Sequence, residues 1–136
     1  MKRTITVLLV ACVLLFSSLT VASASMFDVI APMADNYSNI NVNLDIASGK
    51  AEVSATLYGR IGVTTKATIH LYLQQYKDGK WEDYDDWLKS ENATSCALSK
   101  TISIPKGYTY RAKASYYAYA GSKSEHVTKY SSEVKY

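Results

Sequence analysis

The chain has 136 residues, with 15 Lys or Arg, 12 Asp or Glu and a formal net charge of +3 at pH 7. Removal of a leader that carries Lys2 and Arg3 lowers the charge from +3 to +1, because every acidic residue lies further along the chain. A balance so close to neutral argues against a dedicated nucleic-acid binder. The roughly 110 residues that remain have the size of one domain.

A secretory signal peptide is predicted at residues 1–24. Lys2 and Arg3 form a short positive region, an apolar run follows from Ile5 to Leu19, and Ala22-Ser-Ala24 is a small-x-small cleavage pattern. No second apolar segment follows in the chain. We therefore expect a secreted, extracellular protein, with no transmembrane segment in the mature chain.

Two alternatives for this leader fit less well. A membrane anchor would need a longer apolar run. Lipid attachment at Cys12 would require polar residues after the cysteine, whereas Val13–Phe16 are apolar. Because Cys12 leaves with the signal peptide, Cys96 remains alone and cannot form an intramolecular disulfide. We expect its thiol to be buried and unreactive.

The mature chain alternates polar and apolar residues with a period of two and contains no helical stripe. Residues 25–37 are predicted to be an irregular lead-in, and residues 38–136 a β-sandwich domain. The alternation predicts seven strands, near residues 40–46, 51–57, 68–76, 81–87, 96–104, 108–119 and 127–136. Short strands at such spacing, without helices, are typical of an antiparallel β-sandwich.

Asp78-Gly79, between Lys77 and Lys80, is the strongest turn signal in the chain. The dipeptide tolerates the positive φ of a two-residue hairpin, so cross-strand pairs can be counted outward from it if no bulge intervenes. The predicted pairs are Tyr76 with Trp81, Gln74 with Asp83, Tyr72 with Asp85, and His70 with Trp87. These eight side chains would share one face, opposite the core-facing Ile69, Leu71 and Leu73.

The long strand at 108–119 carries five tyrosines, and its alternation divides them between two faces. The core-facing set is predicted to be Tyr108, Tyr110, Ala112, Ala114, Tyr116 and Ala118. The exposed set is predicted to be Thr109, Arg111, Lys113, Ser115, Tyr117 and Tyr119. Three of the five tyrosines are therefore expected to be structural.

The segment Ser99–Ala114, read SKTISIPKGYTYRAKA, resembles the E-to-F strand region of fibronectin type III and related immunoglobulin-like domains. In that pattern an apolar strand, a Pro-Gly-like corner and a tyrosine-containing strand follow each other. The resemblance implies a seven-stranded antiparallel sandwich in which Tyr108 is the corner tyrosine, with its hydroxyl bonded to nearby backbone. The whole chain also resembles small exported proteins of uncharacterised function from Gram-positive bacteria, a similarity that implies no activity.

A fibronectin-like arrangement would place the strand at 108–119 beside the strand that carries His70 and Tyr72. The outer face of that sheet would then run from acidic through aromatic to basic side chains. The candidate binding residues are His70, Tyr72, Tyr76, Trp81, Asp83, Asp85, Trp87, Arg111, Lys113 and Tyr117. Exposed Trp and Tyr stack well on sugar rings or partner side chains. Alternatively, such cross-strand pairs only stabilise the sheet, by roughly 0.2–1 kcal/mol per pair.

No motif indicates a catalytic, metal or cofactor site. The carboxylates of Glu82–Asp86 alternate between strand faces and lack the spacing of a calcium loop. His70, His126 and Cys96 have no zinc-site spacing and are fewer than the four ligands of a structural zinc. No nucleophile elbow or phosphate-binding glycine loop occurs.

We therefore expect a non-catalytic exported module without a cofactor. It would bind a protein or a glycan, at the cell surface or in the medium, through its aromatic-rich sheet face. The alternative function is a structural or surface domain that assembles with itself by strand addition, using Val127–Tyr136 as an exposed edge. A small hydrolase is a third possibility.

Overall fold

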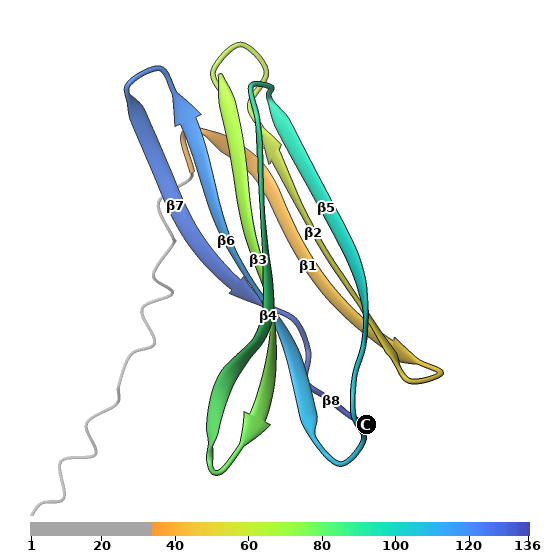
Figure 1. The fold of residues 1–136 in the computed structure, drawn as a ribbon. Helices are drawn as coiled ribbons and strands as arrows, with labels where there is room; N and C mark the ends of the chain where they lie inside the picture. The colour runs from red at the N-terminus through yellow and green to blue at the C-terminus, as the bar shows by residue number, and fades with distance from the viewer. Residues whose placement is uncertain (1–33) are drawn as a thin grey trace, which may run out of the picture. The chain divides into compact units, whose positions relative to one another are not determined.

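The computed structural model describes residues 34–136, so the predicted signal peptide and residues 25–33 of the lead-in lie outside the described residues. Eight strands make up most of the described chain (Figure 1). They are β1 (Tyr37–Ala47), β2 (Lys50–Gly59), β3 (Lys66–Lys77), β4 (Lys80–Glu91), β5 (Ser95–Ser103), β6 (Thr109–Ala120), β7 (Lys123–Tyr130) and β8 (Val134–Lys135). Among residues 34–136 there is no helix of the length and apolarity needed to cross a bilayer.

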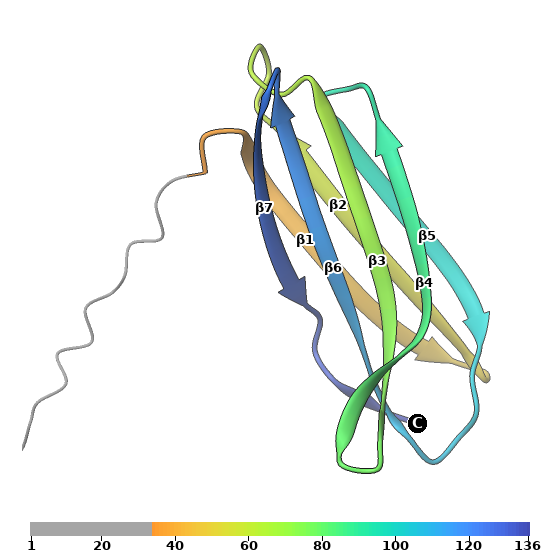
Figure 2. The ribbon, with the colours of Figure 1, turned by 60° about the vertical axis from the view of Figure 1, so that its left-hand side comes forward.

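The strands form two antiparallel sheets that pack against each other. The small sheet has the order β1-β2-β5, and the large sheet has the order β4-β3-β6-β7, with β8 paired to the start of β6. In Figure 2 the small sheet lies behind the large one. The predicted all-β antiparallel sandwich is confirmed, with one short strand more than the seven expected.

Alternation along each strand builds the core between the sheets. The buried positions of β2 and β6 fall at every second residue: Ala51, Val53, Ala55 and Leu57 on β2, and Tyr110, Ala112, Ala114, Tyr116 and Ala118 on β6. Ile69, Leu71 and Leu73 of β3 are fully buried as predicted. Cys96 is also buried, and this burial raises the pKa of its thiol. Every second residue of β6 therefore points away from the core, so one strand both fills the interior and presents side chains to solvent.

The turn at Asp78-Gly79 has the predicted geometry, with φ of 52° at Asp78 and 80° at Gly79. It joins β3 and β4 through the pair Lys77 and Lys80, and this hairpin lies at the same end of the sandwich as the loop between β5 and β6 (Figure 1). Further from the turn, the pairing register shifts between Leu73 and Gln74. Such a bulge increases local twist and moves the following residues of one strand to the opposite face.

The corner tyrosine is Tyr110, not Tyr108. The Tyr110 hydroxyl donates a hydrogen bond to the carbonyl of Pro105, at 2.7 Å, and accepts one from Gln75 Nε2, at 3.0 Å. Tyr108 is half-buried and packs against the core. The prediction for Tyr108 was wrong by two residues. Both tyrosines lie on the same face of the strand, so the alternation cannot tell them apart, and the conformation of the corner decides which hydroxyl reaches the backbone.

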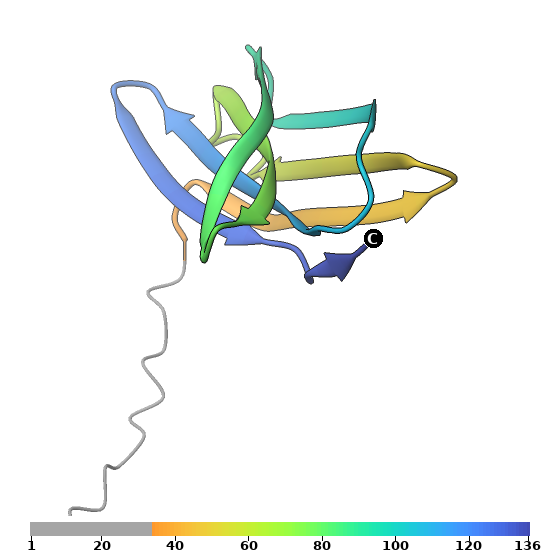
Figure 3. The ribbon, with the colours of Figure 1, turned by 60° about the horizontal axis from the view of Figure 1, so that its bottom comes forward.

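Both ends of the described chain are held against the sandwich. Backbone N–H groups of Asp35 and Asn36 donate to the carboxylate of Glu125, at 2.8 and 2.9 Å, and Asn36 Nδ2 donates to the Ala118 carbonyl, at 3.1 Å. Tyr136 lies beside the turn between β1 and β2 (Figure 3). The predicted last strand at 127–136 is interrupted at residues 131–133, which separate β7 from β8, and both of these strands pair with β6.

Candidate functional site

The candidate site is the outer face of the large sheet, the side that points away from the small sheet. Eight of the ten predicted residues lie on it: His70, Tyr72 and Tyr76 on β3, Trp81 and Asp83 on β4, and Arg111, Lys113 and Tyr117 on β6. Tyr76 faces Trp81 and Gln74 faces Asp83, as counted from the turn. The large sheet therefore brings most of the predicted side chains to one surface.

Asp85 and Trp87 are not on this face, and their predicted pairings were wrong. Because Tyr84 is the extra residue of the bulge, Asp85 pairs with Leu73 and Trp87 pairs with Leu71, both of which point into the core. Trp87 packs against the core cluster. The outer positions belong instead to Asp86, opposite Tyr72, and to Leu88, opposite His70.

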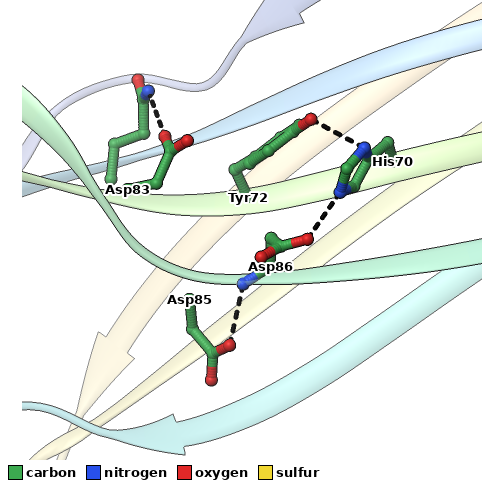
Figure 4. Close-up of polar contacts among 6 residues, drawn as sticks. His70, Tyr72, Asp83, Asp85 and Asp86 are labelled. Atoms are coloured by element: carbon green, nitrogen blue, oxygen red, sulfur yellow. Dashed lines mark hydrogen bonds and ion pairs between the residues drawn. The ribbon is translucent and has the colours of Figure 1, made fainter.

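Three side chains form a hydrogen-bonded chain on the outer face (Figure 4). Because the Asp86 carboxylate only accepts, His70 donates from Nε2 to Asp86 Oδ2 at 2.6 Å. The free His70 Nδ1 then accepts from the Tyr72 hydroxyl at 2.7 Å. In Figure 4 the Asp86 side chain points towards His70, whereas that of Asp85 points away.

The pKa of Tyr72 is raised, first because the phenol is partly buried and then because the carboxylates of Asp83 and Asp86 oppose a phenolate. Lys113 Nζ lies 4.2 Å from the centroid of the Tyr72 ring, in a cation–π contact. At neutral pH the Tyr72 hydroxyl is therefore a hydrogen-bond donor, and its ring carries a positive charge on one side. The hydrogen bonds between Tyr72, His70 and Asp86 thus orient three polar side chains on the outer face of the sheet.

A second network surrounds Arg111, whose guanidinium lies between two aromatic rings. Its Cζ is 4.1 Å from the Trp81 ring centroid and 4.3 Å from that of Tyr130. Arg111 Nε donates to Gln74 Oε1 at 2.8 Å, and Gln74 Nε2 donates to Asp83 Oδ1 at 2.7 Å. The network thus joins all four long strands of the large sheet and fixes the orientation of each ring.

Three outer-face residues were not predicted there, namely Asp86, His126 and Tyr130, and Gln74 was predicted on this face but not as a binding residue. The ring of His126 stacks on Tyr117, with centroids 4.4 Å apart and an interplanar angle of 19°. Tyr130 and His126 lie on β7, which a two-residue turn at Gly121-Ser122 joins to β6. Gly-Ser is a hairpin dipeptide, and counting pairs outward from it would have placed both residues on the outer face. Gln74 was paired correctly but was not recognised as the bridge between a cation and a carboxylate.

A hollow of about 370 Å³ lies at the hairpin end of the outer face. Its walls are Tyr76, Trp81, Thr109 and Glu133. Tyr76 is 44% exposed, and its ring centroid is 5.2 Å from that of Trp81, with the two planes tilted by 58°. Two rings at an angle, a hydroxyl and a carboxylate thus meet around one open space.

The remaining chemistry of the described residues is that of a polar surface. No group of three or more His, Cys, Asp or Glu side chains gathers in residues 34–136 in a way that could hold a metal ion. The described part of the chain also leaves no buried side-chain nitrogen or oxygen without a hydrogen-bond partner. The arrangement can therefore offer stacking surfaces, fixed charges and hydrogen-bond donors to a ligand.

Comparison with protein-family models finds no match, and comparison with curated proteins finds none either. Among solved structures, the chain is similar to the solution structure of CsgH from R. palustris. The TM-score is 0.41 and the sequence identity 8%, over 66% of this chain and 88% of that chain. The function has to be inferred from the side chains of the site.

Proposed function

We propose that residues 38–136 form a non-catalytic binding module of an exported protein, and that the outer face of the large sheet contacts the partner. A protein surface is the partner class that this face fits best. Trp, Tyr and Arg are the residue types that dominate binding energy at protein interfaces. Here they are concentrated on one face, as Trp81, Arg111, Tyr72, Tyr76 and Tyr130.

The stacking of Arg111 between Trp81 and Tyr130 is the observation that carries this proposal. Side chains that are ordered before binding lose less conformational entropy when the partner arrives. Gln74, which donates to Asp83, accepts a hydrogen bond from the guanidinium on a third side. A face whose large side chains hold each other in place is suited to contact with a second surface.

The absence of catalysis is part of the same proposal. The chain of Tyr72, His70 and Asp86 has the order of a nucleophile, a base and an orienting acid. It lies, however, on the outer face of a sheet, where the side chains of His70 and Asp86 are 30% and 54% exposed, whereas catalytic sites exclude water around the reacting atoms. We therefore interpret it as an orienting network for binding rather than as a hydrolase centre.

Self-assembly through the C-terminal strand receives less support from the geometry. Lys129 of β7 pairs with the buried Ala114, so its stem points towards the small sheet, and its Nζ donates to the Ile40 carbonyl of β1 at 3.1 Å. An inward-pointing lysine on an edge strand hinders the addition of another strand. The interruption after Tyr130 also shortens the edge that Val127–Tyr136 was expected to offer.

A binding screen of the purified protein against cell-surface proteins and a glycan array tests this function. We expect a partner whose affinity falls at least about tenfold in both Trp81→Ala and Arg111→Ala. Tyr58→Ala is the matched control, because Tyr58 is 49% exposed on β2 of the small sheet. A partner that tolerates both changes in the large sheet but is lost with Tyr58→Ala would contradict the proposal. If a glycan binds and its binding is lost in Trp81→Ala, the proposed site is correct and the partner is a glycan instead of a protein.

A further inference from the structure

The hollow at the hairpin end of the outer face has the dimensions of a site for a small group. Its volume of about 370 Å³ falls in the range of roughly 300–1,000 Å³ that is usual for small-ligand pockets. Tyr76 and Trp81 are each adjacent to a residue of the pair that closes the β3–β4 turn, so a tight hairpin holds both rings in place. Such a site needs no movement of the backbone to receive a ligand.

Among the four residues that line the hollow, Glu133 carries a negative charge and none carries a positive one, while the Arg111 guanidinium lies 4.1 Å from the centroid of the Trp81 ring. The faces of the Tyr76 and Trp81 rings are electron-rich, and they form a corner with centroids 5.2 Å apart. Glu133 adds a carboxylate and Thr109 adds a hydroxyl. Glu133 takes part in none of the ion pairs found among residues 34–136. Its charge is therefore available to a ligand.

The rest of the domain shows what its aromatic rings accept. Within residues 34–136, five aromatic rings have a Lys or Arg cation placed over them: Trp81, Tyr130, Tyr72, Tyr119 and Tyr136. Proteins on average contain roughly one energetically significant pair of this kind per 70–80 residues. Many aromatic rings of the domain thus make cation–π contacts. Tyr76 is exposed, and its ring takes part in none of these pairs.

We propose that the hollow binds an alkylammonium group, which sits in the corner of Tyr76 and Trp81 with Glu133 as its counter-charge. Aromatic corners that recognise ammonium groups combine the ring quadrupoles with a nearby carboxylate, and the cation loses little hydration if its charge is spread over alkyl groups. The group can come from a lysine side chain of a protein partner or from a free quaternary ammonium compound. This inference rests on the proposed function, since it places the recognised group at one end of the same face.

An NMR titration with choline tests the site directly. We expect choline to shift the indole N–H resonance of Trp81 saturably, while that of Trp87, which packs on the core, stays in place as an internal reference. 3,3-Dimethyl-1-butanol, the neutral isostere of choline, should bind at least about fivefold more weakly, since it lacks the charge. N-acetyl-lysine amide serves as the second probe, and the tighter of the two cations identifies the source of the group.

Two carboxylate variants make the test specific. Glu133→Gln should weaken choline at least about fivefold, whereas Glu52→Gln, the same change on the small sheet, should leave binding unaltered. Equal responses to choline and to its neutral isostere, or equal choline affinity in the wild type and Glu133→Gln, would overturn the proposal.

The two proposals can fail separately. If neither cation shifts Trp81 but a partner still depends on Trp81 and Arg111, only the ammonium site is wrong. If choline binds as expected but no partner depends on Arg111, the site stands and the larger binding face is wrong.

Discussion

The outer faces of the two sheets have the same strand geometry but carry different side chains. The outer face of the small sheet has one aromatic ring, Tyr58, and one cation, Lys50, and its other side chains are small or polar: Asn39, Asn41, Asn43, Asp45, Ala47, Glu52, Ser54, Thr56, Ser95, Ala97, Ser99, Thr101 and Ser103. Among these residues the structure shows no side-chain to side-chain hydrogen bond, ion pair or cation–π contact. The large sheet instead has an interlocking set of rings, cations and carboxylates.

This difference is informative because both sheets bury equivalent inner faces. Val53 and Leu57 of the small sheet and Leu71 and Leu73 of the large sheet are all fully buried, so each sheet meets the same requirement for a core. A sandwich of this size is therefore complete with short polar residues outside, as the small sheet demonstrates. The rings and cations of the large sheet go beyond what folding demands, which is why we assign the binding role to that face.

The largest expected effect separates the two tryptophans. Trp87→Ala should lower the free energy of unfolding by about 2–4 kcal/mol, because Trp87 packs against the core cluster and its loss leaves a cavity. Trp81→Ala should cost only about 1 kcal/mol, since it removes stacking on the outer face. Urea denaturation followed by far-UV circular dichroism measures both. Equal losses of stability in the two variants would contradict the assignment of Trp87 to the inner face of β4 and of Trp81 to its outer face.

A smaller effect is expected at the centre of the large face. Arg111→Ala removes the cation that contacts two rings and leaves Gln74 Oε1 without its donor, while Gln74 keeps its bond to Asp83. We expect a loss of about 1–2 kcal/mol in the free energy of unfolding. Arg111→Lys keeps the charge but not the flat stacking group, so it should fall between the wild type and Arg111→Ala. A change below about 0.5 kcal/mol for Arg111→Ala would show that the network contributes no stability.

The acidic side chains of the large face should control the titration of Tyr72. Its pKa is raised by burial and by the carboxylates of Asp83 and Asp86, so the folded protein holds this proton more tightly than the unfolded chain. The resulting stabilisation is complete below the unfolded pKa of about 10 and is lost as the pH rises through the folded value. Asp83→Asn should lower the pKa of Tyr72, measured by NMR of the ring carbons. Asp45→Asn, on the small sheet, should not, and a matching shift there would contradict the assignment.

The sequence allowed the strand faces to be predicted because the side-chain period of a strand is two. The buried residues of β2 and β6 and the pairs nearest the turn, Tyr76 with Trp81 and Gln74 with Asp83, followed from counting. The conformation of the turn at Asp78-Gly79 could also be predicted, since few dipeptides accept two positive φ values in succession.

The bulge at Tyr84 could not be predicted in the same way. Asp85 and Asp86 are the same residue type, so a shift of one position leaves an aspartate on either face and the sequence pattern shows no break. Only Trp87 carried a signal, since a large ring opposite a core strand is stabilised by facing inward. The contact of Arg111 with Tyr130 depends on the register of β7, which the two-residue turn at Gly121-Ser122 sets, so the sequence did hold this signal.

The smallest expected effect is on the small sheet, and the contrast between the two faces depends on it. Glu52→Gln and Ser99→Ala change exposed positions for which the structure shows no side-chain hydrogen bond or ion pair, so each should alter the free energy of unfolding by no more than about 0.5 kcal/mol. Urea midpoints and choline affinity, measured on the same samples, should both match the wild type. A loss above about 1 kcal/mol in either variant would reveal interactions on this face that the geometry does not contain. If both variants are tolerated while Arg111→Ala is not, the inner faces cannot explain the difference, because they are buried alike. The cause must then lie in the outer side chains of the large sheet.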